Sequence, residues 1–254
     1  MTDWLVAAAV GLGAGLLSGM FGVGGGVLTI PAIRLLLGYP ELIAIGTSLL
    51  VILPTAITGA IAHTREGNSR VRIGLIVGAW GIPASVLGAL LTRIVGGNTT
   101  LLIVSIVIVL AAIDIVRPGR RGGDLEAGGT PGMTPIGTAL LGLGTGFMSG
   151  LLGLAGGFVL VPLLRRFAGL GVKEAIGTSL VAVALFAIPG SLTHFMVGNV
   201  DIPLALALSA GVVPGALLGT RITLASGERG IRLAFAAFLL IAGLTLGLTE
   251  SGLL

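Results

Sequence analysis

Residues 42–62 read LIAIGTSLLVILPTAITGAIA, a continuous run without a charged side chain. A helix of about 20 apolar residues crosses the hydrocarbon core of a bilayer, which is about 30 Å thick. Four further uncharged runs of similar length follow, at residues 73–92, 94–113, 175–193 and 202–220. The sequence therefore predicts an all-α integral membrane protein whose chain crosses the bilayer several times.

The composition supports this class of protein. The 254 residues are 55% hydrophobic and 9% charged, whereas soluble domains are about 25% charged. There is no cysteine, which excludes disulfides and thiolate chemistry, and a phosphate-binding GxxxxGK[ST] loop is absent. The net charge of +4 comes from scattered arginines beside helix ends, which is typical of membrane topology signals rather than of nucleic-acid binding. We expect a multi-pass protein of the cell membrane, with the lipid bilayer and no nucleic acid as partner, and without cofactor or metal.

The chain also contains an internal duplication, in which Gly11 is paired with Gly142 and Thr92 with Thr223. About 30 of the 82 residue pairs from Gly11 to Thr92 are identical without a gap. Ala44-Ile-Gly-Thr-Ser-Leu49 recurs as residues 175–180, and matched prolines, arginines and histidines accompany it. A linker rich in glycine, proline and charge, at about residues 117–135, separates the copies. We expect two transmembrane repeats, residues 1–127 and residues 128–254.

The arginines indicate that the two repeats have opposite orientations. Three arginines lie in the loop at residues 65–72 and three more in the linker, which predicts that both segments are cytoplasmic. The equivalent of the first loop, residues 198–203, has no basic residue and contains Asp201. Basic residues of the second half instead flank other loops, from Arg165 to Arg232. This pattern predicts inverted-topology repeats.

The first apolar stretch of each repeat, residues 4–37 and 135–168, is too long for one helix and too short for two full crossings with a loop. We expect two short helices that meet at a glycine cluster, as a re-entrant hairpin or broken helix, followed by three transmembrane helices. Such irregular backbone at membrane depth is tolerated where it lines a cavity or is buried in protein. The prediction amounts to about ten helical segments in total.

The glycine clusters are the strongest candidates for a binding site. They read Ser18-Gly-Met-Phe-Gly-Val-Gly-Gly-Gly26 and Ser149-Gly-Leu-Leu-Gly-Leu-Ala-Gly-Gly157. A helix that restarts after such a break directs unpaired N–H groups and its positive dipole end at the break, where an anion can bind. The alternative is that the glycines only allow close helix packing. The candidate substrate-binding residues in the clusters are Ser18, Gly22, Gly24, Gly25, Gly26, Ser149, Gly153, Gly156 and Gly157.

Hydroxyl groups at matched positions form a second element of this site. Thr47 and Ser48 lie five or six residues into one crossing helix, and Thr178 and Ser179 lie at the same place in its equivalent. These side chains can donate to an anion, or they can bond to their own helices, as Ser and Thr do in membranes. We include all four among the candidate substrate-binding residues.

His63 and His194 end equivalent helices and are candidates for proton coupling or gating, because histidine changes charge near neutral pH. A plain interfacial role beside polar loops is the alternative. No paired carboxylates or Ser/His/Asp arrangement appears in the sequence. We therefore expect a protein that is not an enzyme.

The glycine-rich opening, the repeated Gly-Thr-Ser, the histidine followed by Gly-Asn and the two-fold duplication resemble the TauE/SafE family of membrane proteins. The resemblance covers nearly the whole chain and is interrupted mainly at the linker. It implies export of sulfite or of small organosulfonates such as sulfoacetate, whereas the residues themselves indicate only a site suited to anions.

The sequence and this resemblance together predict a secondary transporter, working as an exporter, of small sulfur-containing anions by alternating access around a midplane site. One alternative is an anion channel, which would show unitary conductance in bilayer recordings. Another is a membrane module that assembles a partner without transport, whose function would survive bulky residues at Thr47 and Thr178. The sequence leaves a monomer and a homo-oligomer open.

Overall fold

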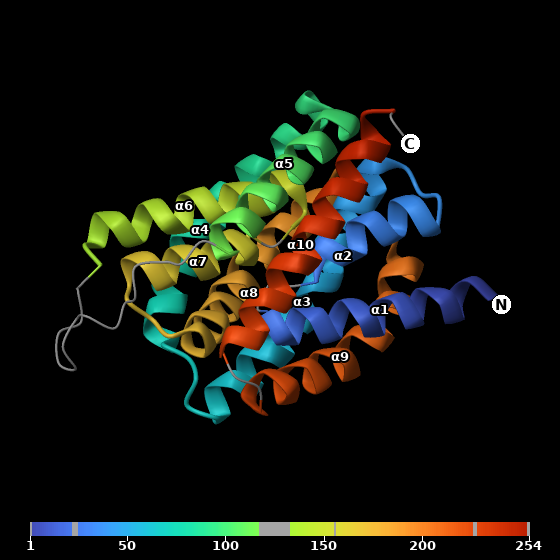
Figure 1. Cartoon of the computed structure of the whole chain (residues 1–254). Helices are drawn as coiled ribbons and strands as arrows, with labels where there is room; N and C mark the ends of the chain where they lie inside the picture. The colour runs from blue at the N-terminus through green and yellow to red at the C-terminus, as the bar shows by residue number, and fades with distance from the viewer. Residues whose placement is uncertain (1, 22–24, 117–132, 155, 226–227, 253–254) are drawn as a thin grey trace.

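The computed structural model describes residues 2–21, 25–116, 133–154, 156–225 and 228–252. In the first half, the helices are α1 (Thr2–Phe21), α2 (Gly26–Pro31), which continues as a π-helical turn (Ala32–Leu36), α3 (Glu41–Arg65), α4 (Val71–Val95) and α5 (Gly97–Val116). In the second half they are α6 (Pro135–Leu152), α7 (Gly157–Phe167), α8 (Val172–Met196), α9 (Ile202–Ala225) and α10 (Glu228–Glu250). All regular elements of the described residues are helical, so the predicted all-α class is confirmed (Figure 1).

Six of the described helices are long and apolar enough to cross a membrane, namely α1, α3, α4, α6, α8 and α9. Large apolar side chains face outward on them, for example Leu5, which is 71% exposed, and Leu206, which is 67% exposed. Contiguous exposed apolar surface of this kind is stable against lipid rather than water. The chain is therefore a multi-pass α-helical membrane protein.

The predicted breaks occur at the glycine clusters, but the expectation of two short helices is wrong, because the helix before each break is longer than expected. The helix before the break has 20 residues in α1 and 18 in α6, whereas the described helix after it ends at Leu36 or Phe167. Glycines do not interrupt α1 earlier because Gly11, Gly15 and Gly19 lie directly against the backbone of α9. This packing stabilises the helix that their conformational freedom would otherwise weaken.

The predicted crossing at residues 94–113 is also placed wrongly at its start. Helix α4 continues to Val95, and α5 begins only at Gly97. Between them Gly96 adopts a φ of +85°, which ends α4 and turns the chain. Hydropathy could not locate this turn, because the run stays uncharged through Gly96 and Gly97.

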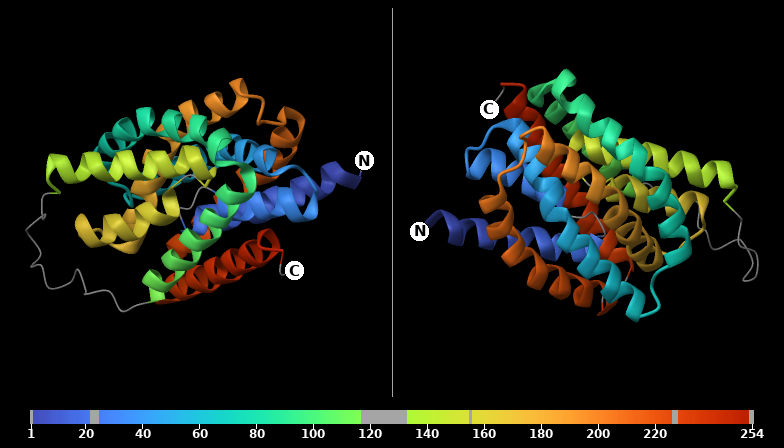
Figure 2. Two further views of the ribbon diagram at one scale, coloured as in Figure 1. Left: turned by 90° about the horizontal axis from the view of Figure 1, so that it is seen from above. Right: turned by 180° about the vertical axis from the view of Figure 1, so that it is seen from behind.

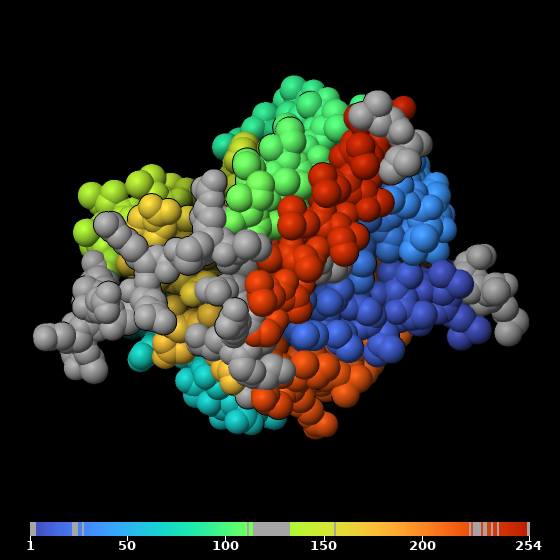
Figure 3. Space-filling model, viewed as in Figure 1, coloured from blue at the N-terminus to red at the C-terminus, as the bar shows by residue number. Residues whose placement is uncertain are grey.

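Helices from the two halves pack against each other throughout the molecule (Figures 1 and 2). Helix α1 lies along α9, the equivalent α6 lies along α4, and α3 contacts α8 in the middle. Helix α10 packs along α5, and in Figure 3 it crosses one face of the molecule beside α1. The described glycines at the ends of these helices, Gly25, Gly26, Gly153 and Gly156, are thereby buried in the interior.

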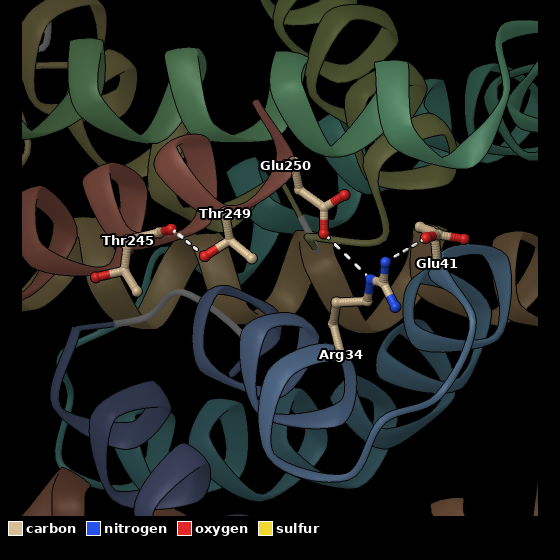
Figure 4. A network of polar contacts seen from close by, with 5 residues as sticks. All are labelled: Arg34, Glu41, Thr245, Thr249 and Glu250. Atoms are coloured by element: carbon tan, nitrogen blue, oxygen red, sulfur yellow. Dashed lines mark hydrogen bonds and ion pairs between the residues drawn. The ribbon is translucent and has the colours of Figure 1, made fainter. Parts of the chain in front are cut away.

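An ion-pair network fastens the end of α10 to the first half (Figure 4). Arg34 donates to the Glu250 carboxylate over 3.2 Å and also pairs with Glu41 at the start of α3. The Glu250 side chain is only 4% exposed. With its amide nitrogen turned toward Glu250, Asn98 donates to the same carboxylate at 2.9 Å. A buried carboxylate is thus held by donors from two other elements.

We expect the Arg34→Ala substitution to lower the free energy of unfolding by on the order of 2 kcal/mol, because it leaves the Glu250 carboxylate buried without its counter-charge. Arg70→Ala is the matched control. Arg70 pairs with Glu174 over 3.1 Å, but its side chain is 59% exposed, and exposed pairs contribute at most about 1 kcal/mol. Thermal unfolding of both variants in detergent measures the difference. Equal losses of stability would contradict the larger contribution that we assign to the buried Arg34–Glu250 ion pair.

Candidate functional site

The two helix breaks share one local geometry. Gly25 precedes α2 with a φ of +82°, and Gly156 precedes α7 with a φ of +61°, a region that side-chain-bearing residues rarely adopt. Neither residue supplies a side chain to cap the helix that follows. The first N–H groups of these helices therefore depend on other partners. The predicted site residues Gly22 and Gly24 lie outside the described residues.

The two breaks contact each other in the interior. A Cβ atom at Gly26 would lie 2.9 Å from the carbonyl oxygen of Gly153 and 3.0 Å from the Cα atom of Leu154. The Ser48 hydroxyl donates to the same carbonyl of Gly153 over 3.2 Å and lies 2.6 Å from the hydroxyl of Thr29. Ser48 and Thr29 are fully buried. The structure thus joins both glycine clusters and Ser48 into one buried centre.

Ser18 and Ser149 are equivalent residues in the last turn of α1 and of α6. Both are fully buried, and neither hydroxyl has a hydrogen-bond partner among the described residues. The Cβ atom of Ser18 lies 3.7 Å from the position of a Cβ atom at Gly25, which places this serine beside the break. A buried hydroxyl without a partner costs about 1–3 kcal/mol, so such groups call for an explanation.

The structure places Thr47 and Thr178 in contacts between the two halves. The Thr47 hydroxyl accepts the backbone N–H of Asp201 over 3.0 Å, and the Thr178 hydroxyl accepts that of Arg70 over 2.9 Å. Ser179 donates to the carbonyl of Ile176 in its own helix, over 2.8 Å. These three hydroxyls therefore have partners within the protein, unlike those of Ser18 and Ser149.

The histidines are buried rather than interfacial. His63 and His194 are fully buried, and their Nε2 atoms lie 3.5 Å from the carbonyl of Gly19 and 2.8 Å from that of Gly150. A carbonyl only accepts, so Nε2 carries the proton in this arrangement. The Nδ1 atoms have no partner among the described residues. Each histidine thus binds the residue that follows Ser18 or Ser149.

Sequence reasoning missed Thr29, because its equivalent in the second repeat is Leu160 and no matched pattern marks it. Within the described ranges, no group of His, Asp or Glu side chains could hold a metal ion. The side-chain donors described at the centre, those of Ser18, Thr29, Ser48 and Ser149, are neutral hydroxyls, and backbone N–H groups lie beside them at the helix breaks. Such groups can bind a small ligand that offers several acceptor atoms.

A family model described as "Sulfite exporter TauE/SafE" matches residues 7–246. The chain belongs to the TauE/SafE family. The match spans both helix breaks, both Gly-Thr-Ser segments and both histidines of the chain. The predicted resemblance is thereby confirmed.

Curated relatives of this TauE/SafE protein carry transporter names. Two from Bacillus subtilis are named "Probable membrane transporter protein YdhB", 27% identical over 82% of this chain and 86% of that protein, and "Probable membrane transporter protein YunE", 27% identical over 87% and 88%. A relative from Methanocaldococcus jannaschii, named "Probable membrane transporter protein MJ0441", is 27% identical over 92% of each chain. No solved structure matches. The TauE/SafE chain is accordingly a membrane transporter.

Proposed function

We propose that this transporter is a secondary exporter of small sulfur-containing anions, such as sulfite or sulfoacetate, in the cell membrane. The family description supports the substrate class. The observation that carries the proposal is the meeting of two helix breaks beside Ser18 and Ser149, whose buried hydroxyls lack partners among the described residues. The proposal assigns transport and no catalysis to the chain.

The chemistry of the site suits an oxyanion. Sulfonate and sulfite oxygens accept hydrogen bonds, and serine hydroxyls can rotate to donate to them. Helix α7 begins at Gly157 after an uncapped break, so its N–H groups and positive dipole end favour a negative charge there. We propose Ser18, Ser149, Gly25, Gly26 and Gly156 as the first contacts. Ser48 would hold Gly153 in place through its hydrogen bond.

The arrangement of helices supports alternating access by inverted repeats. Helix α1 runs along α9 in the same direction, since Gly11 meets Leu208 and Gly19 meets Ala216. The equivalent helix α6 runs along α4 in the same way, and it begins on the side opposite to the start of α1 (Figure 2). We propose that the two repeats, residues 1–127 and 128–254, rock against each other around the central site. Ser18, Ser48 and Ser149 are enclosed in this structure, so access requires such a motion.

The two histidines fit a gating role in this scheme. His63 joins α3 to α1 at Gly19, and His194 joins α8 to α6 at Gly150. Breaking either hydrogen bond would release a helix break from the neighbouring crossing helix. Protonation at the open Nδ1 atom would keep this bond and place a positive charge beside the break, and we propose that this charge couples the anion site to the proton gradient.

Thermal stability of the purified protein in detergent tests the proposed function. We expect sulfite or sulfoacetate to raise the Tm with the logarithm of its concentration above the Kd, by the equivalent of about 2.7 kcal/mol at a hundred times the Kd. The double variant Ser18→Ala and Ser149→Ala should lose most of this shift, because both donors are removed. Taurine, sulfate, acetate and chloride test the substrate class.

The matched control is the double variant Ser105→Ala and Ser191→Ala. These serines are also buried, but their hydroxyls bond to carbonyls of their own helices over 2.8 and 3.0 Å. Their loss should leave the anion-induced shift intact. Absence of a shift with every anion, or an unchanged shift in the Ser18 and Ser149 variant, would refute the proposed site.

A further inference from the structure

Two more deeply buried hydroxyls of the described residues lack a partner, in the helices that pack along α1 and α6. They belong to Ser85 of α4, which is fully buried, and to Thr220 of α9, which is 1% exposed. Neither position belongs to the glycine clusters or to the Gly-Thr-Ser segments. Each of the two parallel helix pairs, α1 with α9 and α6 with α4, therefore has a hydroxyl without a partner in each of its helices.

These hydroxyls behave unlike most others in the protein. A serine or threonine within a membrane helix ordinarily bonds to a carbonyl three or four residues earlier. That bond is made here by the buried hydroxyls of Thr55, Thr92, Ser105, Thr138, Thr145, Ser191 and Thr193. Ser85 and Thr220 do not make it, although their helices continue regularly through these positions. Their hydroxyls are thus buried without the bond that a membrane helix ordinarily supplies.

Both residues lie next to the proposed anion site. Gly150, which follows Ser149, has no room for a Cβ atom because the carbonyl of Ser85 occupies that space. Gly190 of α8 lies against the Ser85 hydroxyl in the same way. In the other pair, the backbone nitrogen of Thr220 lies 2.8 Å from the Cβ position of Gly19, which follows Ser18. Each repeat thus packs the backbone of a residue with an unpartnered hydroxyl against the glycine that follows the serine of the other repeat.

We propose that Ser85 and Thr220 complete the substrate site as hydroxyl donors and determine which anions bind. This inference rests on the proposed function and extends it to α4 and α9. The ligand would be a small oxyanion whose several oxygens accept from Ser18 with Thr220 and from Ser149 with Ser85. The two pairs are not equivalent. In the duplication Ser85 corresponds to Ala216, and Thr220 corresponds to Ala89, so neither hydroxyl is repeated at the matched position. Thr220 lies about four residues, or about 6 Å along α9, beyond the position that corresponds to Ser85.

The test replaces each hydroxyl and measures two quantities, the Tm without ligand and the Kd for sulfite and sulfoacetate from the Tm shift. The variants are Ser85→Ala and Thr220→Val, the latter nearly identical in shape to threonine. We expect each to raise the Kd about tenfold, the effect of one lost hydrogen bond. The Tm without ligand should stay unchanged or rise, because a buried hydroxyl without a partner is replaced by an apolar group.

The matched control is Thr223→Val, in the next turn of α9. The Thr223 hydroxyl is fully buried and donates to the carbonyl of Met20 over 2.7 Å. This variant should lower the Tm and leave the Kd unchanged, which reverses the pattern expected of Thr220→Val. Ser105→Ala serves as the corresponding control for Ser85→Ala, since Ser105 bonds to Leu102.

The outcomes separate this inference from the proposed function. A Tm that falls in Thr220→Val as it does in Thr223→Val would show that the hydroxyl has a structural partner and would overturn the inference. An unchanged Kd in both variants, together with a loss of binding in the Ser18 and Ser149 variant, would also overturn it while leaving the proposed function standing. If neither anion shifts the Tm of the unmodified protein, the proposed function and the inference built on it both fail.

Discussion

Gly150→Ala should destabilise the protein strongly, by about 3 kcal/mol, the upper end for overpacking a core. The added Cβ atom would overlap the carbonyl oxygen of Ser85 and approach the nitrogen of Ala89 to 2.9 Å. Both atoms belong to the backbone of α4, so no side-chain rotation relieves the clash. Helices α4 and α6 must then separate. Thermal unfolding in detergent measures the loss.

Gly144→Ala is the control for this prediction, because Gly144 lies in the same helix with nothing within 4 Å of its Cβ position. Alanine is favoured over glycine in a helix by about 0.5–1 kcal/mol, so this variant should be as stable as the parent or slightly more stable. If the two alanines have the same effect, the close contact between α4 and α6 does not hold the fold together.

Gly156→Ala is expected to weaken anion binding, with at least a tenfold rise in Kd. Alanine at a φ of +61° costs about 1–2 kcal/mol, and its Cβ atom would lie 2.5 Å from the carbonyl oxygen of Thr145. The break before α7 must then change shape, which turns the first N–H groups of α7 away from the proposed ligand. Anion-induced Tm shifts and export from proteoliposomes loaded with sulfite are the two measurements.

Gly198→Ala is the control for Gly156→Ala, because it adds the same backbone strain at a glycine outside the proposed site. Gly198 has a φ of +79° but nothing within 4 Å of its Cβ position, and it lies in the loop between α8 and α9. This variant should lose a similar amount of stability from its backbone conformation and keep its anion binding. Equal losses of binding in both variants would show that strain alone, rather than the break before α7, accounts for the effect.

The matched motifs of the two repeats acquire a structural meaning in these contacts. Gly46 allows the carbonyl of Asn199 to approach α3, and Gly177 allows that of Asn68 to approach α8. Beside each glycine, the threonine hydroxyl accepts an N–H from the same loop. The Gly-Thr of one repeat therefore holds the Gly-Asn loop of the other. This reciprocity explains why both motifs occur twice in the sequence.

Much of the fold could be predicted from local sequence, because its causes act within a single helix or turn. Uncharged runs located the crossing helices α3, α4, α8 and α9, and glycine clusters located the breaks after Phe21 and Leu152. Helix lengths around the breaks were predicted less well. The glycines of α1 remain helical only because α9 lies against them, and α9 belongs to the other half of the chain.

The sequence by itself determined that this chain is helical, membrane-embedded, duplicated and interrupted at its glycine clusters, since hydropathy, backbone freedom and repetition are properties of the chain alone. It did not distinguish Ser18 and Ser149 from Thr47 and Thr178, which are all hydroxyls in apolar helices. Only the tertiary structure decided that the threonines hold loops while the serines lack partners in the part of the chain that the structure describes. The physical reason is that a hydroxyl's partner can come from a neighbouring element, and for these threonines that neighbour belongs to the other repeat.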